Sequence, residues 1–425
     1  MAGRPKKKTS GDLSFDELVA KVNAKFGAGA IMRASSARAL TIPRLQTGIF
    51  GIDYITGGGF PIGRIIGIYG LRSSCKTLVA LKTAAAAQGY CRKHLCKMKR
   101  TEKRKYRCEE CGYRGDELGG LCPECKELGY ESHLVDKGDF ELKCPECGEY
   151  NPFRVIWWDA EGSFENRWAA ALGVDCSKLL LSRAEYAEQG VDMADAFLRA
   201  GACELFVIDT LAHLIPSAEI EASATDWQMG LQARLINKLL RRSVSAQNAQ
   251  KLNSGVRPTV LLLNQVRMKL GVMFGNPETK PGGMGQEFAT TIDLRMRGGK
   301  YEKDEYGNTL SQLVKATCEK NKSAPPQMEC TFRVWLADID GHTPGDTNEL
   351  KTILGVAQSR GWFGDSSSGW VYDDKKFKTA KSIYKYLVEN PDELERLRQT
   401  LLAERLGTIE EKDALKNIGL EGDDA

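Results

Sequence analysis

The sequence predicts an α/β fold in which helices cover both faces of a mostly parallel sheet. Apolar segments of strand length alternate with segments rich in helix-forming residues, and polar residues follow the apolar segments. This alternation is typical of a parallel sheet buried on both sides, and ligands bind at the carboxyl ends of such strands. The predicted strands are GRIIGIYG (63–70), RVIWWDAEG (154–162), LFVIDTLAHLI (205–215) and TVLLLNQV (259–266), and the predicted helices include TLVALKTAAAAQG (77–89) and MGLQARLINKLLRRSVSAQ (229–247).

A chain of 425 residues is longer than one hydrophobic core usually supports, so we expect several domains. The stretch LSFDELVAKVNAKFG (13–27) has apolar residues at helical spacing and precedes the main body. We assign residues 1–45 to an N-terminal segment, 46–90 and 153–340 to the core, 91–152 to a cysteine-rich insert, and 341–425 to a C-terminal lobe with an acidic tail.

The net charge is only +4, so any nucleic-acid binding must be local. No stretch of about 20 apolar residues occurs, and no apolar segment follows the basic N-terminus MAGRPKKKTSGD. We therefore expect a cytoplasmic protein without a membrane span. The basic N-terminus is either a solvated tail or an arm that touches nucleic acid.

The stretch GLRSSCKT (70–77) closely matches the phosphate-binding motif G-x-x-x-x-G-K-[ST] and lies between a predicted strand and a predicted helix. Lys76 would reach the β- and γ-phosphates of ATP, and Thr77 would place its hydroxyl on Mg²⁺. Cys75 replaces the second glycine, and an L-residue held at positive φ costs roughly 1–2 kcal/mol. We expect Cys75 to slow hydrolysis without abolishing ATP binding, and Cys75→Gly to raise turnover.

Three other predicted strands end in polar side chains that suit ATP chemistry. Asp209 would hold a Mg²⁺ water, Glu161 would activate water for attack on the γ-phosphate, and Gln265 could sense that phosphate. An aspartate at a strand end is often only a turn former. Three such strand ends downstream of one phosphate loop nevertheless indicate a nucleotide site.

Several stretches resemble the bacterial RecA-type recombinases, and the resemblance covers most of the chain outside the insert. It implies a RecA-like P-loop ATPase core that polymerises on single- and double-stranded DNA, with ATP between neighbouring subunits of a helical filament. It also implies a role in DNA repair, recombination and the SOS response, an N-terminal oligomerisation helix and a C-terminal lobe that modulates duplex entry. The stretches are KFGAGAIMR (25–33), LGVD (172–175), PSAEIEASATDWQMGLQAR (216–234), NQVRMKLGVMFGNPET (264–279) and KNKSAP (320–325).

The same resemblance implies roles at the ATP site. Glu161 resembles the catalytic glutamate, and Gln265 resembles the γ-phosphate sensor that couples ATP to the DNA loops. Trp168 falls where the family stacks an aromatic ring on adenine, and Glu165 falls where it has a carboxylate near the adenine amino group. The expected phosphate and Mg²⁺ contacts are Gly70, Ser73, Ser74, Cys75, Lys76, Thr77, Leu78 and Asp209.

Two DNA-contacting loops are implied at about 221–230 and 266–283. Basic residues there would neutralise phosphates, and Met229 and Leu270 would wedge between bases unless they are ordinary loop packing. Binding of this kind is dominated by the DNA backbone and tolerates any sequence. The implied DNA contacts are Met229, Arg234, Arg267, Lys269, Leu270, Gly282 and Gly283.

Some residues concern the contact with a neighbouring subunit or depart from the family pattern. Lys320 and Lys322 match lysines that reach the ATP of the neighbour. Arg72 stands where an acidic residue is familiar, and Glu287 stands where a basic residue near the neighbour's ATP is usual. These departures and Cys75 bear on the rate of hydrolysis more than on the fold.

The insert contains eight of the 13 cysteines, arranged as CRKHLC, CEEC, CPEC and CPEC. Paired cysteines in a chain without a signal peptide indicate metal ligands rather than disulfides, and the knuckle pattern favours zinc over an iron–sulfur cluster. We therefore predict two Zn²⁺ ions, each held by four thiolates. The predicted ligands are Cys91, Cys96, Cys108, Cys111, Cys122, Cys125, Cys144 and Cys147.

The pairing of these cysteines is open to more than one arrangement. Shorter loops close at lower cost, which favours the first pair with the second and the third pair with the fourth. The alternative joins the second pair to the third. His94 and His133 are reserve ligands, each interpreted as a surface histidine. The stretch 91–107 contains nine Lys or Arg and one Glu, and it is either a solvated linker or an arm that grips DNA or an accessory partner.

The leading functional hypothesis is a DNA-dependent ATPase that promotes homologous pairing and strand exchange. The second is a DNA filament protein that binds ATP but barely hydrolyses it. A third, ranked lower, is a RadA/Sms-like branch-migration ATPase, which also joins zinc to a RecA core. That family carries zinc at its N-terminus and a KNRFG motif, whereas the cysteines here are internal and the lysine motif is KNKSAP.

Overall fold

A computed structural model gives the chain as two compact units, residues 1–43 and 44–425, and each is described by itself. Only the backbone is described at 101–102, 106–108, 114–115, 124, 134–136, 140, 250–253 and 268. The described residues are 14–27, 31, 42–102, 106–108, 114–115, 121, 123–127, 134–136, 140–223, 230–253, 257–268, 278–283, 285–339, 341–347, 349–363, 370–372 and 375–407.

The first unit contains the predicted N-terminal helix, α1 (Phe15–Phe26). Ser14 caps it by accepting the N–H of Glu17, and the Glu17 carboxylate accepts the N–H of Ser14. These two reciprocal bonds satisfy donors that a helix start otherwise leaves free. No residue of α1 is buried within its own unit, so its apolar residues remain open to another surface.

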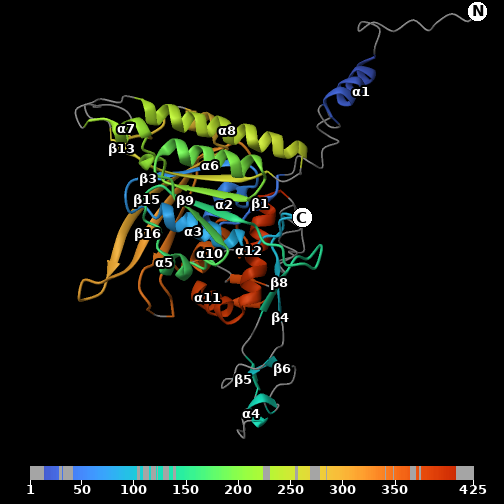
Figure 1. Cartoon of the computed structure of the whole chain (residues 1–425). Helices are drawn as coiled ribbons and strands as arrows, with labels where there is room; N and C mark the ends of the chain where they lie inside the picture. Colours follow the sequence, from blue (N-terminus) through green and yellow to red (C-terminus); the bar gives the residue numbers. More distant parts are fainter. Residues whose placement is uncertain are drawn as a thin grey trace, which may run out of the picture. The chain divides into compact units, whose positions relative to one another are not determined.

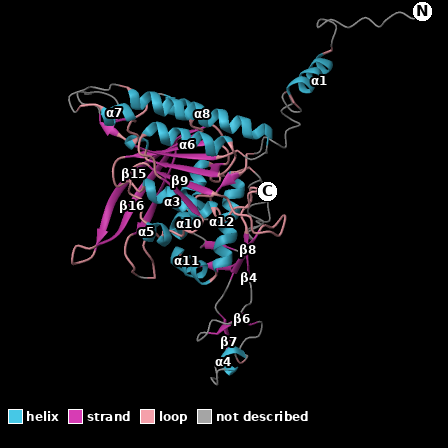
Figure 2. Ribbon diagram, in the orientation of Figure 1, coloured by secondary structure: helices cyan, strands magenta, loops and turns pink. Residues whose placement is uncertain are grey.

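An eight-stranded sheet lies at the centre of the second unit (Figure 2). Its strand order is β10-β9-β11-β12-β3-β15-β16-β17. The strands from β10 to β15 in this order run parallel to one another. β16 pairs antiparallel with β15, and β17 pairs antiparallel with β16. The predicted mostly parallel α/β fold is thereby confirmed. The strands are β3 (Ile65–Gly70), β9 (Val155–Asp159), β10 (Leu179–Ser182), β11 (Leu205–Asp209), β12 (Thr259–Gln265), β15 (Ile292–Lys303), β16 (Thr309–Asn321) and β17 (Met328–Trp335).

Helices cover both faces of this sheet (Figure 1). On one face α6 (Ala187–Arg199) and α8 (Leu231–Asn253) enclose a core that includes Trp158. On the other face α3 (Lys76–Ala87) belongs to a core that includes Trp157. Adjacent residues of β9 thus enter opposite cores, as the two-residue period of a strand requires.

The C-terminal lobe has its own apolar core around the buried residues Trp362, Phe363 and Tyr372. Phe50 of α2 joins this core, and its N–H donates to Glu349 Oε1 at 3.0 Å. The lobe is therefore continuous with the body of the second unit. The elements around this apolar core are α2 (Phe50–Thr56) from the body of the unit and, from the lobe, α10 (Glu349–Ser359), β18 (Trp370–Tyr372), β19 (Lys375–Phe377), α11 (Ala380–Glu389) and α12 (Pro391–Arg405).

The insert leaves the core after α3 and returns before β9, and its two ends are held together. Isolated bridges join Tyr90 to Lys97 and Cys91 to Pro152. Beyond them β4 (Lys99–Glu102) pairs antiparallel with β8 (Phe140–Lys143). The remaining elements of the insert are β5 (Tyr106–Cys108), β6 (Arg114–Gly115), α4 (Pro123–Glu127) and β7 (Leu134–Asp136).

Among the described residues no helix is long and apolar enough to cross a membrane. Several short elements complete the second unit. These elements are β1 (Arg44–Leu45), β2 (Phe60–Pro61), α5 (Asn166–Ala171), the 3₁₀ helix η3 (Leu211–His213), α7 (Ser217–Glu221), β13 (Arg267–Met268), β14 (Glu278–Thr279) and α9 (Gly285–Ala289).

Candidate active site and metal centre

The phosphate loop runs from Gly70, the last residue of β3, to Lys76, the first residue of α3. A side chain at Gly70 would place its Cβ 2.2 Å from the carbonyl oxygen of Met296 on β15, so only glycine fits. Ser73 and Cys75 have positive φ values of 55° and 61°. Left-handed residues of this kind help successive N–H groups to face one concavity at a helix start, which suits an anion.

Lys76 folds back over the loop. Its Nζ donates to the carbonyl of Leu71 at 2.7 Å and to Ser74 Oγ at 3.4 Å. Burial lowers the pKa of Lys76, while the nearby carboxylates of Asp209 and Glu161 act in the opposite direction. The hydrogen bonds hold the ammonium group of Lys76 beside the loop. A phosphate bound there could accept from it in place of the carbonyl of Leu71.

Thr77 and Asp209 place their side-chain oxygens side by side behind the loop. Thr77 Oγ1 donates to Asp209 Oδ2 at 3.0 Å, and the buried Asp209 Oδ1 has no hydrogen-bond partner in the described part of the chain. Burial raises the pKa of Asp209 to about 7, despite the bond from Thr77. A hydroxyl beside an unpartnered carboxylate oxygen fits Mg²⁺, which prefers hard oxygen ligands.

A cavity of about 360 Å³ lies over the loop, and its lining brings the predicted catalytic residues together. Glu161 follows β9, and its N–H donates to the carbonyl of Asp209 at 3.1 Å. Gln265 ends β12, directly opposite Gly70 on β3. Trp168 of α5 and loop residues 72–78 complete this part of the wall. Glu161, Gln265 and the phosphate loop lie at the carboxyl ends of parallel strands, where the sequence analysis expected a ligand.

Gln312, Tyr301 and His213 are among the residues at this site that were not predicted from the sequence. Gln312 of β16 and Tyr301 of β15 line the same cavity. His213 Nδ1 lies 3.9 Å from Glu161 Oε2 and 3.2 Å from Thr210 Oγ1. Gln312 and Tyr301 belong to a hairpin far along the chain from the phosphate loop and to no motif, so only the pairing of β15 with β3 brings them here. For His213 the signal was its place four residues after Asp209.

The other residues expected around ATP have contacts elsewhere. Glu165 caps α5, since its Oε2 accepts the N–H of Trp168 at 2.9 Å. Lys320 Nζ donates to the carbonyls of Glu287 and, at 2.7 Å, Thr290, and Lys322 Nζ donates to the carbonyl of Phe288 at 3.0 Å. These lysines do not line the described cavity over the chain's own phosphate loop. Their expected contact with a neighbour's ATP stays a prediction.

The expected DNA contacts are only partly described. Arg267 on β13 is exposed, and the exposed Arg234 lines a cavity of about 610 Å³ beside α8 and α9. Gly282 packs against Ile236, while the space that a Cβ of Gly283 would enter is open. Met229, Lys269 and Leu270 lie outside the described residues.

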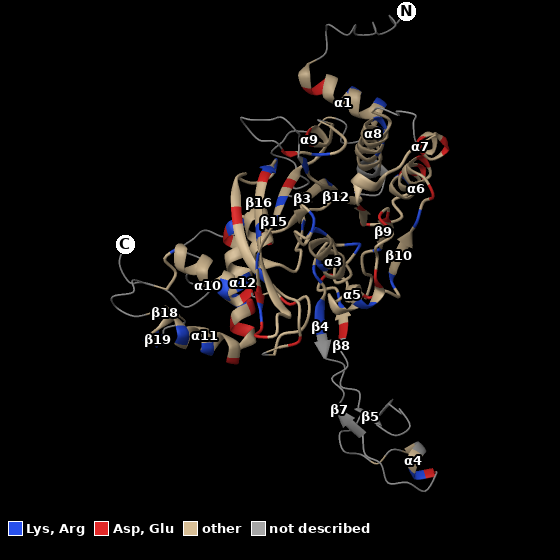
Figure 3. Cartoon of the chain, turned by 90° about the vertical axis from the view of Figure 1, so that its left-hand side faces the viewer, with Lys and Arg blue, Asp and Glu red and all other residues tan. Residues whose placement is uncertain are grey.

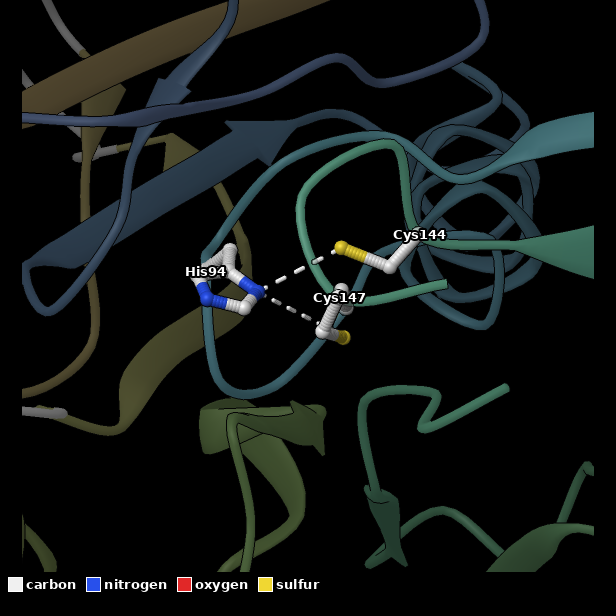
Figure 4. Close-up of side chains that lie close together, drawn as sticks. His94, Cys144 and Cys147 are labelled. Atoms are coloured by element: carbon white, nitrogen blue, oxygen red, sulfur yellow. Dashed lines mark hydrogen bonds between the residues drawn. The ribbon is translucent and has the colours of Figure 1, made fainter. Parts of the chain in front are cut away.

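Cys91, His94, Cys144 and Cys147 place one potential ligand atom each within 4.8 Å of all the others, and this group could hold a metal ion. Cys144 Sγ lies 3.4 Å from His94 Nδ1 (Figure 4), and Cys91 Sγ lies 3.9 Å from it. A tetrahedral Zn²⁺ with usual bond lengths separates sulfur and nitrogen ligands by about 3.5 Å. Burial acts to raise the pKa of the Cys144 thiol, but hydrogen bonds, first those from the N–H groups of Cys147 and Glu146, lower it to about 6.

The pair Cys91 and His94 and the pair Cys144 and Cys147 each lie on a backbone turn of the same kind. The N–H of Leu95 donates to the carbonyl of Cys91 at 2.8 Å, and the N–H of Gly148 donates to the carbonyl of Cys144 at 2.8 Å. Leu95 and Gly148 each follow the second potential ligand of a C-x-x-H or C-x-x-C pair, and both have positive φ, 54° and 70°. The stretch from Cys91 to Leu95 therefore forms the same knuckle as the stretch from Cys144 to Gly148, with His94 in the position of the second cysteine.

This grouping corrects the preferred cysteine pairing. Cys91 lies with Cys144 and Cys147 rather than in a separate site, and His94 is part of the group instead of a lone surface histidine. Cys96 Sγ is 3.7 Å from Cys144 Sγ but does not belong to this group of four. Cys125 is buried. The side chains of Cys108, Cys111 and Cys122, and all of His133, lie outside the described residues, so a second zinc site stays a prediction.

Comparisons with known proteins agree with this geometry. A family model described as the RecA N-terminal domain matches residues 14–97 and 149–339. The chain is 32% identical over 388 residues to Protein RecA of Lactiplantibacillus pentosus, covering 91% of this chain and 83% of that protein. It is 31% identical over 388 residues to Protein RecA of Haemophilus ducreyi, covering 90% and 83%. With a phosphate loop, a strand-end glutamate and a strand-end glutamine in one cavity, the chain belongs to the RecA family.

Proposed function

We propose that this chain is an ATP-dependent DNA recombinase that polymerises on single-stranded DNA and promotes homologous pairing and strand exchange. The observation that carries the proposal is the common cavity of Lys76, Glu161 and Gln265 over a phosphate loop at the carboxyl edge of the sheet. The likeness to Protein RecA from several bacteria over about nine-tenths of the chain supports the same activity. It favours this proposal over a RadA/Sms-like branch-migration ATPase.

The residues of the cavity divide the work of ATP hydrolysis. Lys76 neutralises phosphate charge, and Glu161 orients and deprotonates the attacking water. Thr77 and Asp209 would hold Mg²⁺, which neutralises charge on the β- and γ-phosphates. Gln265 lies beside the start of the phosphate loop and at the end of the strand that leads into the loop 266–283, so it can report the γ-phosphate to that loop.

Assembly on DNA completes the proposal. The apolar residues of α1 need a partner surface, and a neighbouring subunit would supply it in a filament. Arg234 and Arg267 would neutralise DNA phosphates, and Lys320 and Lys322 would reach the ATP of the neighbour. Because such contacts address the backbone of the strand, the protein would accept any sequence.

ATP turnover measured with and without single-stranded DNA tests this function. DNA-stimulated turnover that Glu161→Gln abolishes, with ATP binding retained, is the expected result. Tight ATP binding with no turnover in the wild type would instead support the filament protein that barely hydrolyses ATP, for which the substitution at Cys75 is the specific observation. Failure of the wild type to bind ATP would contradict both.

We also propose that the knuckle group holds one Zn²⁺ through Cys91, His94, Cys144 and Cys147. The matching turns at Leu95 and Gly148 favour His94 over Cys96 as the fourth ligand. Metal analysis of the purified chain should then show that His94→Ala loses about one zinc per chain, while Cys96→Ser retains it. The reverse result would assign the position to Cys96. The second zinc, predicted for the remaining cysteines, would appear as a total of two ions per wild-type chain.

A further inference from the structure

Gln312 of β16 contacts the phosphate loop at two points. Its Oε1 lies 3.3 Å from Cys75 Sγ, and its Nε2 donates to the carbonyl of Ser73 at 3.3 Å. These are the two residues of the loop with left-handed backbone, at φ 61° and 55°. Gln312 is only 4% exposed, so its amide is fixed among neighbours rather than free in solvent.

A glycine on the intervening strand allows this contact. Gly298 lies on β15 between β3 and β16, and a Cβ there would lie 2.7 Å from Gln312 Nε2 and 2.8 Å from the carbonyl oxygen of Ser73. The β15–β16 register shifts between Gly298 and Tyr301, and Tyr301 is paired with Gln312. The irregular strand and the missing side chain together leave room for the amide to reach the loop.

The Cys75 thiol is the hydrogen-bond donor of the first contact. Burial raises the pKa of this thiol to about 11, although Lys76 beside it acts in the opposite direction. At neutral pH the group is therefore S–H, and it can donate to the amide oxygen of Gln312. The Gln312 amide thus accepts from one strained residue and donates to the other.

We propose that Gln312 is a positioning residue for the phosphate loop and that it acts through Cys75 and Ser73. In a loop with the usual glycine, the left-handed turn carries no side-chain penalty and needs no such support. Here an L-residue occupies the turn, and the amide fixes it in the conformation that receives phosphate. This inference rests on the proposed ATP site. For Cys75→Gly it predicts no tighter binding of ATP, because that substitution removes an anchor as well as a strained side chain.

A double-mutant cycle on ATP binding tests the inference. Cys75→Ala keeps the strained backbone but removes the donor, and Gln312→Leu removes both contacts of the amide. Each hydrogen bond contributes about two- to twelvefold to affinity. A fluorescent ATP analogue, measured on the full-length chain without DNA, should bind about two- to twelvefold more weakly to Cys75→Ala. It should bind still more weakly to Gln312→Leu, which loses both contacts. The double variant should be no weaker than Gln312→Leu alone.

Conservative substitutions separate positioning from a general loss of structure. Cys75→Ser keeps a donor and should restore affinity relative to Cys75→Ala, but only when Gln312 is present. In steady state the KM for ATP should rise while kcat changes less than about twofold, since the contacts position the loop in ground and transition states alike. Tyr306→Ala, an exposed position in the same hairpin, is the matched control and should bind as the wild type does.

Three results would overturn the inference: independent effects that multiply in the double variant, no rescue by Cys75→Ser, or tighter binding by Cys75→Gly. Should Gln312→Leu fail to fold, Gln312→Glu keeps an acceptor for the thiol and loses the donor to Ser73. That variant should retain its coupling to Cys75, and a loss of coupling would count against the proposal. Absence of ATP binding by the wild type would contradict the proposed function instead.

Discussion

Trp168 has the surroundings expected of a platform for a flat ring. It lines the cavity over the phosphate loop and packs against the core that contains α3. Its backbone N–H is fixed by the carboxylate of Glu165, which caps the helix that carries it. The half-buried indole is therefore held at one side of the cavity and stays partly accessible to a ligand.

Replacing this ring should weaken ATP binding with little effect on the chemical step. Stacking of a base on an aromatic ring contributes about 1–3 kcal/mol, so Trp168→Ala should raise the KM for ATP by about tenfold or more. Trp168→Phe keeps a ring and should lose less than half of that binding free energy. Steady-state kinetics over a range of ATP concentrations measures both. A fall in kcat at unchanged KM would show that Trp168 supports Glu161 rather than the base.

Single residues of the site differ in how far the sequence could predict them. The positive φ of Cys75 follows from its place in the motif and is confirmed. The contact with Gln312 could not be foreseen, because 237 positions separate the two residues and the contact depends on a register shift opposite Gly298. Motifs predict residues that a common ligand brings together, but they carry no information on a local replacement for a missing glycine.

At the scale of elements, the neck of the insert, formed by β4, β8 and the bridge from Cys91 to Pro152, shows why the preferred cysteine pairing was wrong. The alternative pairing leaves the first pair with the fourth, and the structure does place Cys91 beside Cys144 and Cys147. The prediction relied on the lower cost of closing short loops, yet each doubling of loop length adds only about 0.6 kcal/mol. The antiparallel pairing of β4 with β8 and the bridge from Cys91 to Pro152 already bring the two ends of the insert together. Once those strands pair, Cys91 and Cys144 are neighbours despite their distance in sequence.

A buried ion pair joins the C-terminal lobe to the core. Asp53 of α2 is fully buried, and its Oδ2 lies 3.5 Å from Arg398 of α12. Its Oδ1 accepts the N–H and hydroxyl of Thr47 at 2.7 and 2.8 Å. Glu349 of α10 also lies near Arg398, at 3.7 Å. Burial raises the pKa of Asp53 to about 7, and it outweighs the opposing effects of Arg398 and Thr47.

This carboxyl group should make stability depend on pH. The pKa of Asp53 is higher in the folded state than in the unfolded state. Its contribution to the free energy of unfolding is therefore fully present below about pH 4 and is lost as pH rises through about 7. Between pH 5.5 and 8.5 the loss should be on the order of 2 kcal/mol. Asp53→Asn removes the titration, so its free energy of unfolding should fall less over that interval than the wild type's. Denaturant titration at the two pH values measures the difference.

A surface carboxylate on the same helix as Arg398 provides the control for this experiment. Asp392→Asn at the start of α12 should leave the pH dependence of the wild type unchanged, because Asp392 is exposed. If Asp53→Asn and the wild type lost equal stability between the two pH values, Asp53 would not be the group responsible.

At the scale of the whole molecule, the family match and the structure place the insert at the same point. The family model covers residues 14–97 and resumes at 149, so the unmatched part begins just inside the neck that the candidate metal group encloses. The parallel centre of the core was predictable because β3, β9, β11 and β12 lie in continuous apolar runs that polar residues follow. The interior of the insert has no such apolar runs, and only the spacing of its cysteines indicated a metal site.

The base of the insert carries exposed positive charge. Lys93, Lys97 and Lys99 are exposed, as is Arg100, and β4 is marked by basic residues in Figure 3. Lys99 lies directly opposite Lys143 across the β4–β8 pair. Like charges directly opposite each other on paired strands are destabilising. Lys143 already pairs with Glu141 at 3.4 Å, so an anionic partner would act mainly on the charge of Lys99.

If that partner is DNA, the salt dependence of binding reports it directly. Each phosphate neutralised on a single strand contributes about 0.7 to the slope of log affinity against log salt. Changing Lys93, Lys97, Lys99 and Arg100 to Gln in the zinc-loaded, full-length chain should therefore reduce the slope by up to about 3. A variant with Lys and Arg exchanged at the same positions keeps the charge and should keep the slope. Unchanged affinity and slope in the Gln variant would make this segment a solvated linker, and the loops of the core would then account for all contacts with DNA.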